Sequence, residues 1–367
     1  MKRIWSQCVK EVAQFRRDRL TFALAFILPL GMLLVFGYAI RLEAKNISLA
    51  IQDFDASPLS RSYIERLFAT NQFQPVDWSG DGDPITILDR GLAKAAVVIP
   101  PEFSRRIKDE KTSPVQVLVD GTDVNNARVI RNSIRATTRF FLQSQGRSPQ
   151  PAVVARMRLW FNPGRKESLF IVPGLYAVIL AIFPALLATL AMVREKEQGT
   201  IVQVYASNLS AAELLLGKGL AYFLVAVGEA ACIMGLGSLL FGIGLAGNPL
   251  PLLLGTGLFA IASVLYGLFI GVRSSNRIAA VQGVAFTGFM ASFLFSGFIY
   301  PLSNIPFPVS LIANIVPARY YIDVSRDAFV RGTGWASIGA ALLAITLLGL
   351  LLFAAAWRGL RRMQLPD

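Results

Sequence analysis

Apolar residues gather in several blocks along the chain, with polar segments between them. About 20 apolar residues are needed for a helix to cross the hydrocarbon layer of a bilayer. Membrane-barrel strands would instead alternate apolar and polar positions. The pattern therefore predicts an all-α polytopic membrane domain of six transmembrane helices. The predicted spans are residues 21–40, 169–193, 219–245, 250–272, 278–300 and 336–357.

Residues 41–168 form a long hydrophilic segment that is large enough for a small domain. Strand patterns occur at 47–53, 95–100 and 115–121, and helical patterns at 57–70 and 123–145. Strands that alternate with helices indicate an inserted α/β or α+β domain. The last of these helices carries a polar series, Asn125, Arg128, Arg131, Arg135 and Arg139. The series suits contact with an acidic cargo or partner; the alternative is a solvated helix face.

Positive charge sets the expected orientation of the spans. Lys and Arg precede the first span and follow the second, fourth and sixth. By the positive-inside rule, the N-terminal amphipathic segment 1–20 and the tail 358–367 lie in the cytoplasm, and 41–168 lies outside. The first span follows a basic segment, as a signal peptide would, but its length and the lack of a clear cleavage site predict a retained anchor. The three arginines of the segment 301–335 are a mild objection to this topology.

Composition narrows the classes of function. The net charge is +13, but the basic residues are spread along the chain instead of forming one basic domain, so we expect no nucleic-acid partner. The chain has no histidine and two cysteines, Cys8 and Cys232, which argues against metal catalysis by His or Cys clusters and against a Ser-His-Asp triad. Gly217-Lys218 is not a P-loop, because Ala212 and Gly219 occupy positions that the motif assigns to Gly and to Ser or Thr. We therefore expect no catalytic site, no metal and no cofactor bound by this chain.

The polar segment 194–218, REKEQGTIVQVYASNLSAAELLLGK, joins the second and third spans. Its first four residues carry charges of both signs, which suits helix-face pairing or docking to another protein better than topology control alone. Gly199 is expected to end the helix. Ser210 and Glu213 form a capping box, so the next helix should begin in the cytoplasm. The alternative is a surface linker without a partner.

Polar and small residues inside the spans give further candidates. Glu229 follows Lys218 by 11 residues, about 16 Å along a helix, so it falls near the middle of the membrane. Such a carboxyl group usually faces a cavity or an interface, and it has two possible roles, one in the transport path and one in a hydrogen bond between helices. Two ladders of small residues permit close helix packing. They are Ser263, Gly267 and Gly271 on the fourth span, and Gly288, Ser292 and Ser296 on the fifth.

The segment 301–335 is predicted to contain a re-entrant helix and an outer amphipathic helix. The apolar run 307–316 is short and flanked by prolines, which predicts a re-entrant or interfacial helix. Pro317 should then open an amphipathic helix with ion pairs between Arg319 and Asp323 and between Asp327 and Arg331.

The segment 194–218 resembles the signature of type-2 ABC transporter permeases, which reads R-E-K-E-x-G-T followed by Leu-Ser-x-x-E-Leu-x-x-Gly-Lys. The stretch FSGFIYPLSNIPFPVSLIANIVPARYYIDVSRDAFVRG resembles the S-G-x-x-x-P-x-x-x-x-P turn and the P-x-x-Y motif of the same family. LAIQDFD and VLVDGTDVNNAR resemble the subgroup with a large extracytoplasmic domain. One departure is Ala206-Ser-Asn208, where many relatives have Thr-Pro.

The resemblance implies a permease that works as a homodimer or related heterodimer with two copies of a separate ABC ATP-binding subunit, which holds ATP and Mg. A periplasmic adaptor is a further expected partner besides the lipid bilayer. The implied coupling residues are Arg194, Glu195, Lys196, Glu197, Gly199 and Thr200. The implied outer gate includes Pro301, Pro317 and Tyr320.

The leading hypothesis is the membrane subunit of an ATP-driven exporter in a bacterial inner membrane, with a hydrophobic or amphipathic substrate such as a drug or lipid. The alternatives are an ATP-independent transporter or membrane enzyme, and a membrane-anchored receptor or scaffold. Few charges within the spans and no internal repeat of spans disfavour a secondary transporter. A receptor would not need five further spans.

Overall fold

The computed structural model describes residues 1–40, 46–70, 72–76, 78, 82–122, 124–146, 161, 162, 164, 166–199 and 209–362. The chain forms two compact units. The helical unit contains Met1–Ile40 and Arg158–Asp367, and the inserted unit is Arg41–Met157. The insertion thus lies between the first and second predicted spans.

The helical unit contains six helices that are long and apolar enough to cross a membrane, counted over the described residues. This confirms the prediction of a mostly helical chain with six spans. Five are single helices: α2 (Arg19–Ala39), α7 (Ser168–Glu197), α9 (Ala211–Phe241), α10 (Leu250–Arg273) and α15 (Trp335–Arg362). The remaining span is built from α11 (Arg277–Val284), the π-helix η1 (Ala285–Phe289) and α12 (Met290–Phe295). Shorter helices flank the spans: α1 (Lys2–Arg17), η2 (Leu302–Asn304), α13 (Ser310–Ala313), α14 (Pro317–Arg326) and the π-helix η3 (Asp327–Arg331).

Two helices end before the predicted spans do. Helix α9 ends at Phe241, before the predicted end at 245, because Gly242 adopts a left-handed conformation with φ of 60°. Helix α12 ends at Phe295, five residues before the predicted end at 300. In both places apolar residues continue past the helix, so hydrophobicity alone overestimates its length.

Helix α7 forms the centre of the helical unit and contacts α2, α9, α10, α11 and α14. In the most apolar 18-residue stretch of α7, 83% of the residues are buried, whereas the corresponding share is 44% or less in the other five spans. The closest neighbour of α7 is α10, where a Cβ on Gly267 would lie 2.1 Å from the Ala185 carbonyl oxygen. The Thr189 hydroxyl donates a 2.7 Å hydrogen bond to the Gly267 carbonyl in this contact. The small residues of α10 therefore serve packing within one chain.

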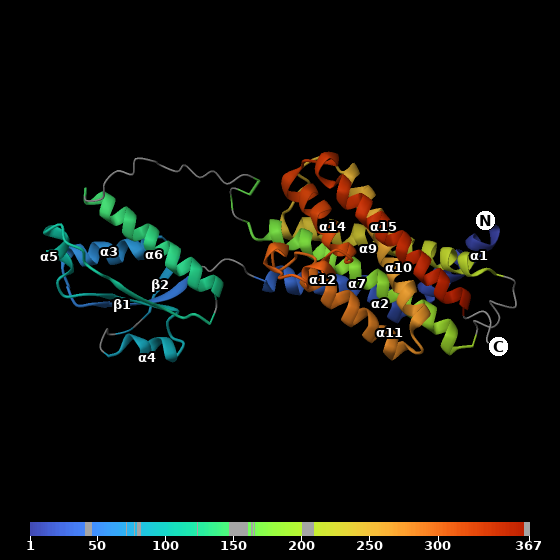
Figure 1. The fold of residues 1–367 in the computed structure, drawn as a ribbon, viewed down its shortest axis with the longest axis horizontal. Helices are drawn as coiled ribbons and strands as arrows, with labels where there is room; N and C mark the ends of the chain where they lie inside the picture. The colour runs from blue at the N-terminus through green and yellow to red at the C-terminus, as the bar shows by residue number, and fades with distance from the viewer. Residues whose placement is uncertain are drawn as a thin grey trace. The chain divides into compact units, whose positions relative to one another are not determined.

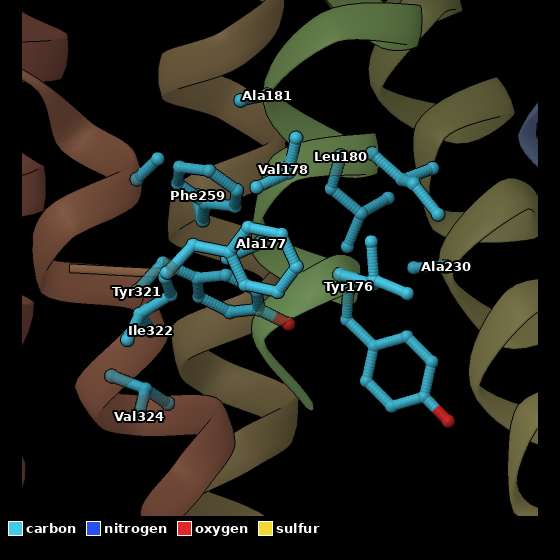
Figure 2. Close-up of a cluster of buried hydrophobic side chains, with 14 of the residues drawn as sticks. Tyr176, Ala177, Val178, Leu180, Ala181, Ala230, Phe259, Tyr321, Ile322 and Val324 are labelled. Carbon is cyan, nitrogen blue, oxygen red and sulfur yellow. The ribbon is translucent and has the colours of Figure 1, made fainter. Parts of the chain in front are cut away.

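Buried aromatic and aliphatic side chains join α7 to its neighbours (Figure 2). The ring of Phe259 from α10 stacks on that of Tyr321 from α14, with centroids 4.2 Å apart and planes tilted by 7°. The Tyr321 hydroxyl lies 2.7 Å from that of Thr256, so this buried polar atom has a partner. The stack fixes α14 against the spans although α14 itself is too short to cross a membrane.

The inserted unit contains a small four-stranded sheet in the order β2-β1-β3-β4. The strands are β1 (Ile47–Asp53), β2 (Phe73–Pro75), β3 (Ala95–Ile99) and β4 (Gln116–Val119), and the helices are α3 (Pro58–Ala69), α4 (Pro84–Asp89), α5 (Phe103–Lys108) and α6 (Val124–Ser144). Strand β1 runs parallel to β2 and β3, with Leu49 opposite Ala95, and β4 is antiparallel to β3, with Val119 opposite Ala95. Helices α3, α5 and α6 share one apolar core with the sheet, and α4 packs in a second, smaller core.

Helix α1 and the C-terminal end of α15 lie at the same end of the helical unit (Figure 1). Side-chain contacts bring four further helix ends to the same place: the end of α7, the start of α9, the end of α10 and the start of α11. The positive-inside rule predicts that these ends lie in the cytoplasm. We call this end the basal end.

Candidate functional site

A buried charge cluster, defined as Glu11, Glu195 and Lys218 with the exposed Lys10 at its edge, joins three helices at the basal end. The Lys218 ammonium lies 2.6 Å from a Glu11 carboxylate oxygen and 3.2 Å from one of Glu195. The Lys10 ammonium lies 2.9 Å from the same Glu195 oxygen. Two positive and two negative charges balance in a place where an unpaired charge would be costly.

The amphipathic helix α1 supplies half of this cluster. It buries Gln7, Cys8, Glu11 and Phe15 on one face. Helix α9 approaches closely because Gly217 has no side chain: a Cβ there would lie 2.7 Å from the Cβ of Gln7. Lys218, next along α9, is fully buried in this contact. The Gly-Lys pair therefore has a structural role: Gly217 lets α1 come close to α9, and Lys218 supplies the positive charge that pairs with Glu11.

Arg194 links the last turn of α7 to the junction between α1 and α2. Its guanidinium donates a 2.8 Å hydrogen bond to Asp18 and a longer one of 3.3 Å to the Thr21 hydroxyl. Asp18 also caps α2 by accepting from the backbone N–H groups of Leu20 and Thr21. The hydrogen bond from the Thr21 hydroxyl, helped by Arg194, lowers the pKa of Asp18.

Lys196 and Glu197 bind the ends of two further helices. The Lys196 ammonium donates to the carbonyl oxygens of Gly271, Val272 and Ser274, where α10 ends. Glu197 accepts from the backbone N–H and from the side chain of Arg277, where α11 begins, at 2.8 and 2.7 Å. A cation at a helix C-terminus and an anion at a helix N-terminus both match the helix dipole.

The family model described as ABC-2 family transporter protein matches residues 19–358. The chain belongs to the ABC-2 transporter family. It is 26% identical over 345 residues to the probable multidrug ABC transporter permease YbhS of Escherichia coli, covering 90% of this chain and 89% of that protein. It is 27% identical over 332 residues to the related YbhR, covering 90% of each, and 25% identical over 314 residues to the inner membrane transport permease YhhJ, covering 82% and 81%. The predicted class, a membrane permease subunit of an ABC exporter, is confirmed.

The charged run of this ABC-2 permease binds its own chain. Each of the four side chains from Arg194 to Glu197 contacts another element of the chain. Gly199 has a φ of +67° and ends α7 as expected. Thr200 lies outside the described residues, as does 201–208. The coupling role of Arg194 to Thr200 stays a prediction.

The predicted capping box is present at the start of α9. The Ser210 hydroxyl accepts from the Glu213 backbone N–H at 3.2 Å, and the Glu213 carboxylate accepts from the Ser210 backbone N–H at 2.9 Å. Helix α9 therefore begins at Ala211, on the basal side of the buried Lys218. This places the buried charge cluster within the first turns of the helix.

Glu229 is fully buried in α9, and neither carboxylate oxygen has a hydrogen-bond partner in the part of the chain that the structure describes. The structure therefore does not show the hydrogen bond between helices that was one of its two predicted roles, and a place in the transport path stays a prediction.

In the two ladders of small residues on the fourth and fifth spans, Ser263, Ser292 and Ser296 are buried. A Cβ on Gly271 would lie 2.7 Å from that of Met192, and one on Gly288 would lie 3.2 Å from the Tyr266 ring.

The opposite end of the unit holds the predicted gate residues. Pro301 precedes η2, Pro317 opens α14, and the Tyr320 hydroxyl donates a 3.0 Å hydrogen bond to the Asn314 carbonyl. Their role as a gate stays a prediction. Asp327 accepts hydrogen bonds from Thr333, Gly334 and Ser337.

The two ion pairs predicted for this helix are wrong. Neither Arg319 with Asp323 nor Asp327 with Arg331 appears among the ion pairs of the described residues. The second pair fails because Asp327 to Arg331 form a π-helix, in which residues four apart no longer stand one above the other.

Sequence reasoning missed Lys10, Glu11, Asp18 and Arg277. A signal for two of them existed: Glu11 lies on the apolar face of an amphipathic helix, and Asp18 stands immediately before an apolar block in the position of an N-cap. Their partners lie far away in the sequence, so the pairs themselves were not readable. Among the described residues no group of three or more His, Cys, Asp or Glu side chains is placed to hold a metal ion.

Proposed function

We propose that the chain is one half of a dimeric exporter that is driven by two copies of a separate ATP-binding subunit carrying ATP and Mg. The substrate is hydrophobic or amphipathic, as the names of the multidrug permease relatives support. The chain lies in a bacterial inner membrane with both termini in the cytoplasm. The inserted unit then forms an α/β domain on the outer side.

The observation that carries the coupling part of this proposal is the set of bonds made by the last turn of α7. Its four consecutive charged residues hold four places: the α1–α2 junction, the buried charge cluster with α1 and α9, the end of α10 and the start of α11. A push on the segment that follows α7 would therefore reach five neighbouring helices at once. We propose that these bonds form a clamp that transmits ATPase movement, and that the ATPase docks on the surface around it, including the exposed face of α1.

Substitutions in the clamp and in a docking surface should have different effects. Loss of a docking residue separates the subunits, whereas loss of a clamp bond leaves the complex intact and weakens the transmission of movement. Lys196 is the most suitable residue for this distinction, because it bonds only to carbonyl oxygens of α10 and of the residue after it among the described residues. Its removal leaves no partner charge unpaired.

The test is a Lys196→Met variant co-expressed with an ABC ATP-binding subunit that co-purifies with the wild-type chain. We expect normal co-purification and ATP hydrolysis, with export of a hydrophobic dye from cells lowered about tenfold. The matched control is Arg358→Met, which removes one exposed positive charge at the C-terminal end of α15. It should leave all three measurements unchanged.

Unchanged export in Lys196→Met, or parallel loss of co-purification and hydrolysis, would contradict the clamp. A failure of the wild-type chain to co-purify with any ATP-binding subunit would contradict the proposed function itself.

A further inference from the structure

The inserted unit contains a hollow of about 1090 Å³ between α5, α6 and the edge strand β4. The apolar part of its lining, which we call the floor, includes Phe103, Ile107, Val115, Val117, Phe141 and Leu142. A second hollow of about 530 Å³ lies along the same helix and strand and shares Val117, Ile134 and Arg135 with the first. Pockets for small organic ligands occupy roughly 300–1,000 Å³, so the space is of ligand size.

Four arginines of α6 line the two hollows: Arg128, Arg131, Arg135 and Arg139. Their spacing of three or four residues puts them on one side of the helix. All four are solvent-exposed, and none forms an ion pair within the described part of the chain. The other charged side chains that line the larger hollow, Glu110 and Lys111, have opposite signs. The hollows therefore keep a strong positive charge.

Two further observations favour a ligand over a defect of packing. Four like charges along one gap repel one another, and chance packing offers no reason to gather them beside an apolar floor. The Ser113 hydroxyl lines the larger hollow and is buried without a hydrogen-bond partner among the described residues. A buried polar atom without a partner is costly unless something that enters the hollow bonds to it.

We propose that this site binds a single-chain amphipathic anion. Its hydrocarbon chain lies on the floor formed by α5, β4 and α6, and its acidic headgroup meets the arginines of α6. An inorganic anion would leave the apolar floor unused, and a neutral hydrophobic molecule would leave the arginines without partners. The inference concerns binding to the inserted unit alone and does not depend on export or on ATP.

The test is photolabelling of the full-length chain in nanodiscs of phosphatidylcholine, without ATP. The probe is dodecanoate carrying a diazirine on its chain, and mass spectrometry locates the labelled peptides. We expect label in the peptides that contain 115–119 and 134–142, and we expect excess unlabelled dodecanoate to suppress it. The methyl ester of the same probe, which has no charge, should label these peptides at least fivefold less.

The matched variants separate the site from general positive charge. The double variant Arg135→Gln/Arg139→Gln should lower the labelling about tenfold at limiting probe, roughly threefold per exposed arginine. The control Arg61→Gln/Arg90→Gln removes two exposed arginines of the same unit that do not line either hollow. It should label like the wild type.

Equal labelling by the acid and its methyl ester would overturn the proposal, because the arginines would then have no part in binding. Equal loss in both double variants would overturn it too. Label confined to the membrane spans would show that the hollow is empty for this class of ligand. The replaced arginines are exposed and make no ion pairs in the described part, so the unit should fold in every variant. A melting temperature of each variant equal to that of the wild type checks this.

Discussion

Removal of the Lys218 ammonium is the sharpest test of the buried charge cluster. In Lys218→Met both carboxylates stay buried. Glu195 keeps its ion pair with Lys10, whereas Glu11 loses its cation and keeps hydrogen bonds from the Gln7 amide and the Tyr222 hydroxyl. At an effective dielectric constant of about 20, the two distances of 2.6 and 3.2 Å correspond to gross attractions of about 6 and about 5 kcal/mol. Desolvation offsets much of this, and loss of one partner of a buried pair costs about 3–5 kcal/mol in practice.

The variant should release α1 from α9, because Glu11 lies on α1 and Lys218 on α9. Cys8 reports this directly: it is buried on the same face of α1. Burial, and next the negative charge of Glu11, raise the pKa of the Cys8 thiol, so release of α1 also makes the thiol more reactive. If about 3 kcal/mol of the loss falls on the docked state of α1, maleimide labelling of Cys8 should become about 100-fold faster.

The assay uses the complete chain in nanodiscs with Cys232 replaced by Ala, so that Cys8 is the single thiol. Lys2→Met is the control, since it removes an exposed positive charge from α1. The double variant Glu11→Met/Lys218→Met replaces one buried pair by apolar side chains and leaves Glu195 with Lys10, and its labelling should slow at least tenfold relative to Lys218→Met. A labelling rate in Lys218→Met within about threefold of the control would refute the reasoning that the pair holds α1 in place.

Two further variants test the neighbouring contacts. The folded-state pKa of Asp18 is lowered, so its charge stabilises the fold above the unfolded pKa of about 3.9 and this contribution is lost as the pH falls through the lower folded value. Asp18→Asn, which keeps a good N-cap, should therefore cost about 0.5–1 kcal/mol near pH 7 in thermal unfolding, and the difference from wild type should shrink only below about pH 4. Gly267→Ala should lower thermal stability by several kcal/mol, because its Cβ would meet the Ala185 carbonyl oxygen at 2.1 Å. Gly257→Ala in the same helix has open space and should be neutral or stabilise by up to ~1 kcal/mol; similar melting temperatures for the two would contradict the packing argument.

Local patterns account for the parts of the fold that the sequence predicts well. Strand β1 coincides with the predicted 47–53, α6 begins and ends within one residue of the predicted helix, and the capping box joins residues three positions apart. Each of these features is determined by residues that are close together in the sequence, so the local sequence pattern is sufficient to predict it. Strand β2, with three residues, is too short to produce a pattern of its own.

The candidate site was predicted only in part, because its bonds are not local. The sequence marks Arg194 to Glu197 as unusual, but it does not show that Lys218 meets Glu11, which is 207 positions away. The same pattern of mixed charges would arise in a docking surface and in an internal clamp. The partners of these charges depend on how the helices pack. The path of α1 along α9, for example, follows from the buried face of α1 and the missing side chain at Gly217.

Helix α7 is anchored at both ends, and this constrains how the permease can move. At the end opposite the buried charge cluster, the Ser325 hydroxyl of α14 donates to the Pro173 carbonyl at 2.8 Å, and the Arg326 guanidinium stacks 4.0 Å above the Phe170 ring. Between the anchors, the fit of α10 leaves no room for sliding, because the backbones touch at Gly267. We therefore expect α7 and α10 to move as one body, with α14 carried along and any bend located at Pro184, where a helix hydrogen bond is missing. A covalent crosslink between α7 and α10 near Gly271 should then leave export intact, whereas loss of export on crosslinking would show that α7 slides on α10 instead.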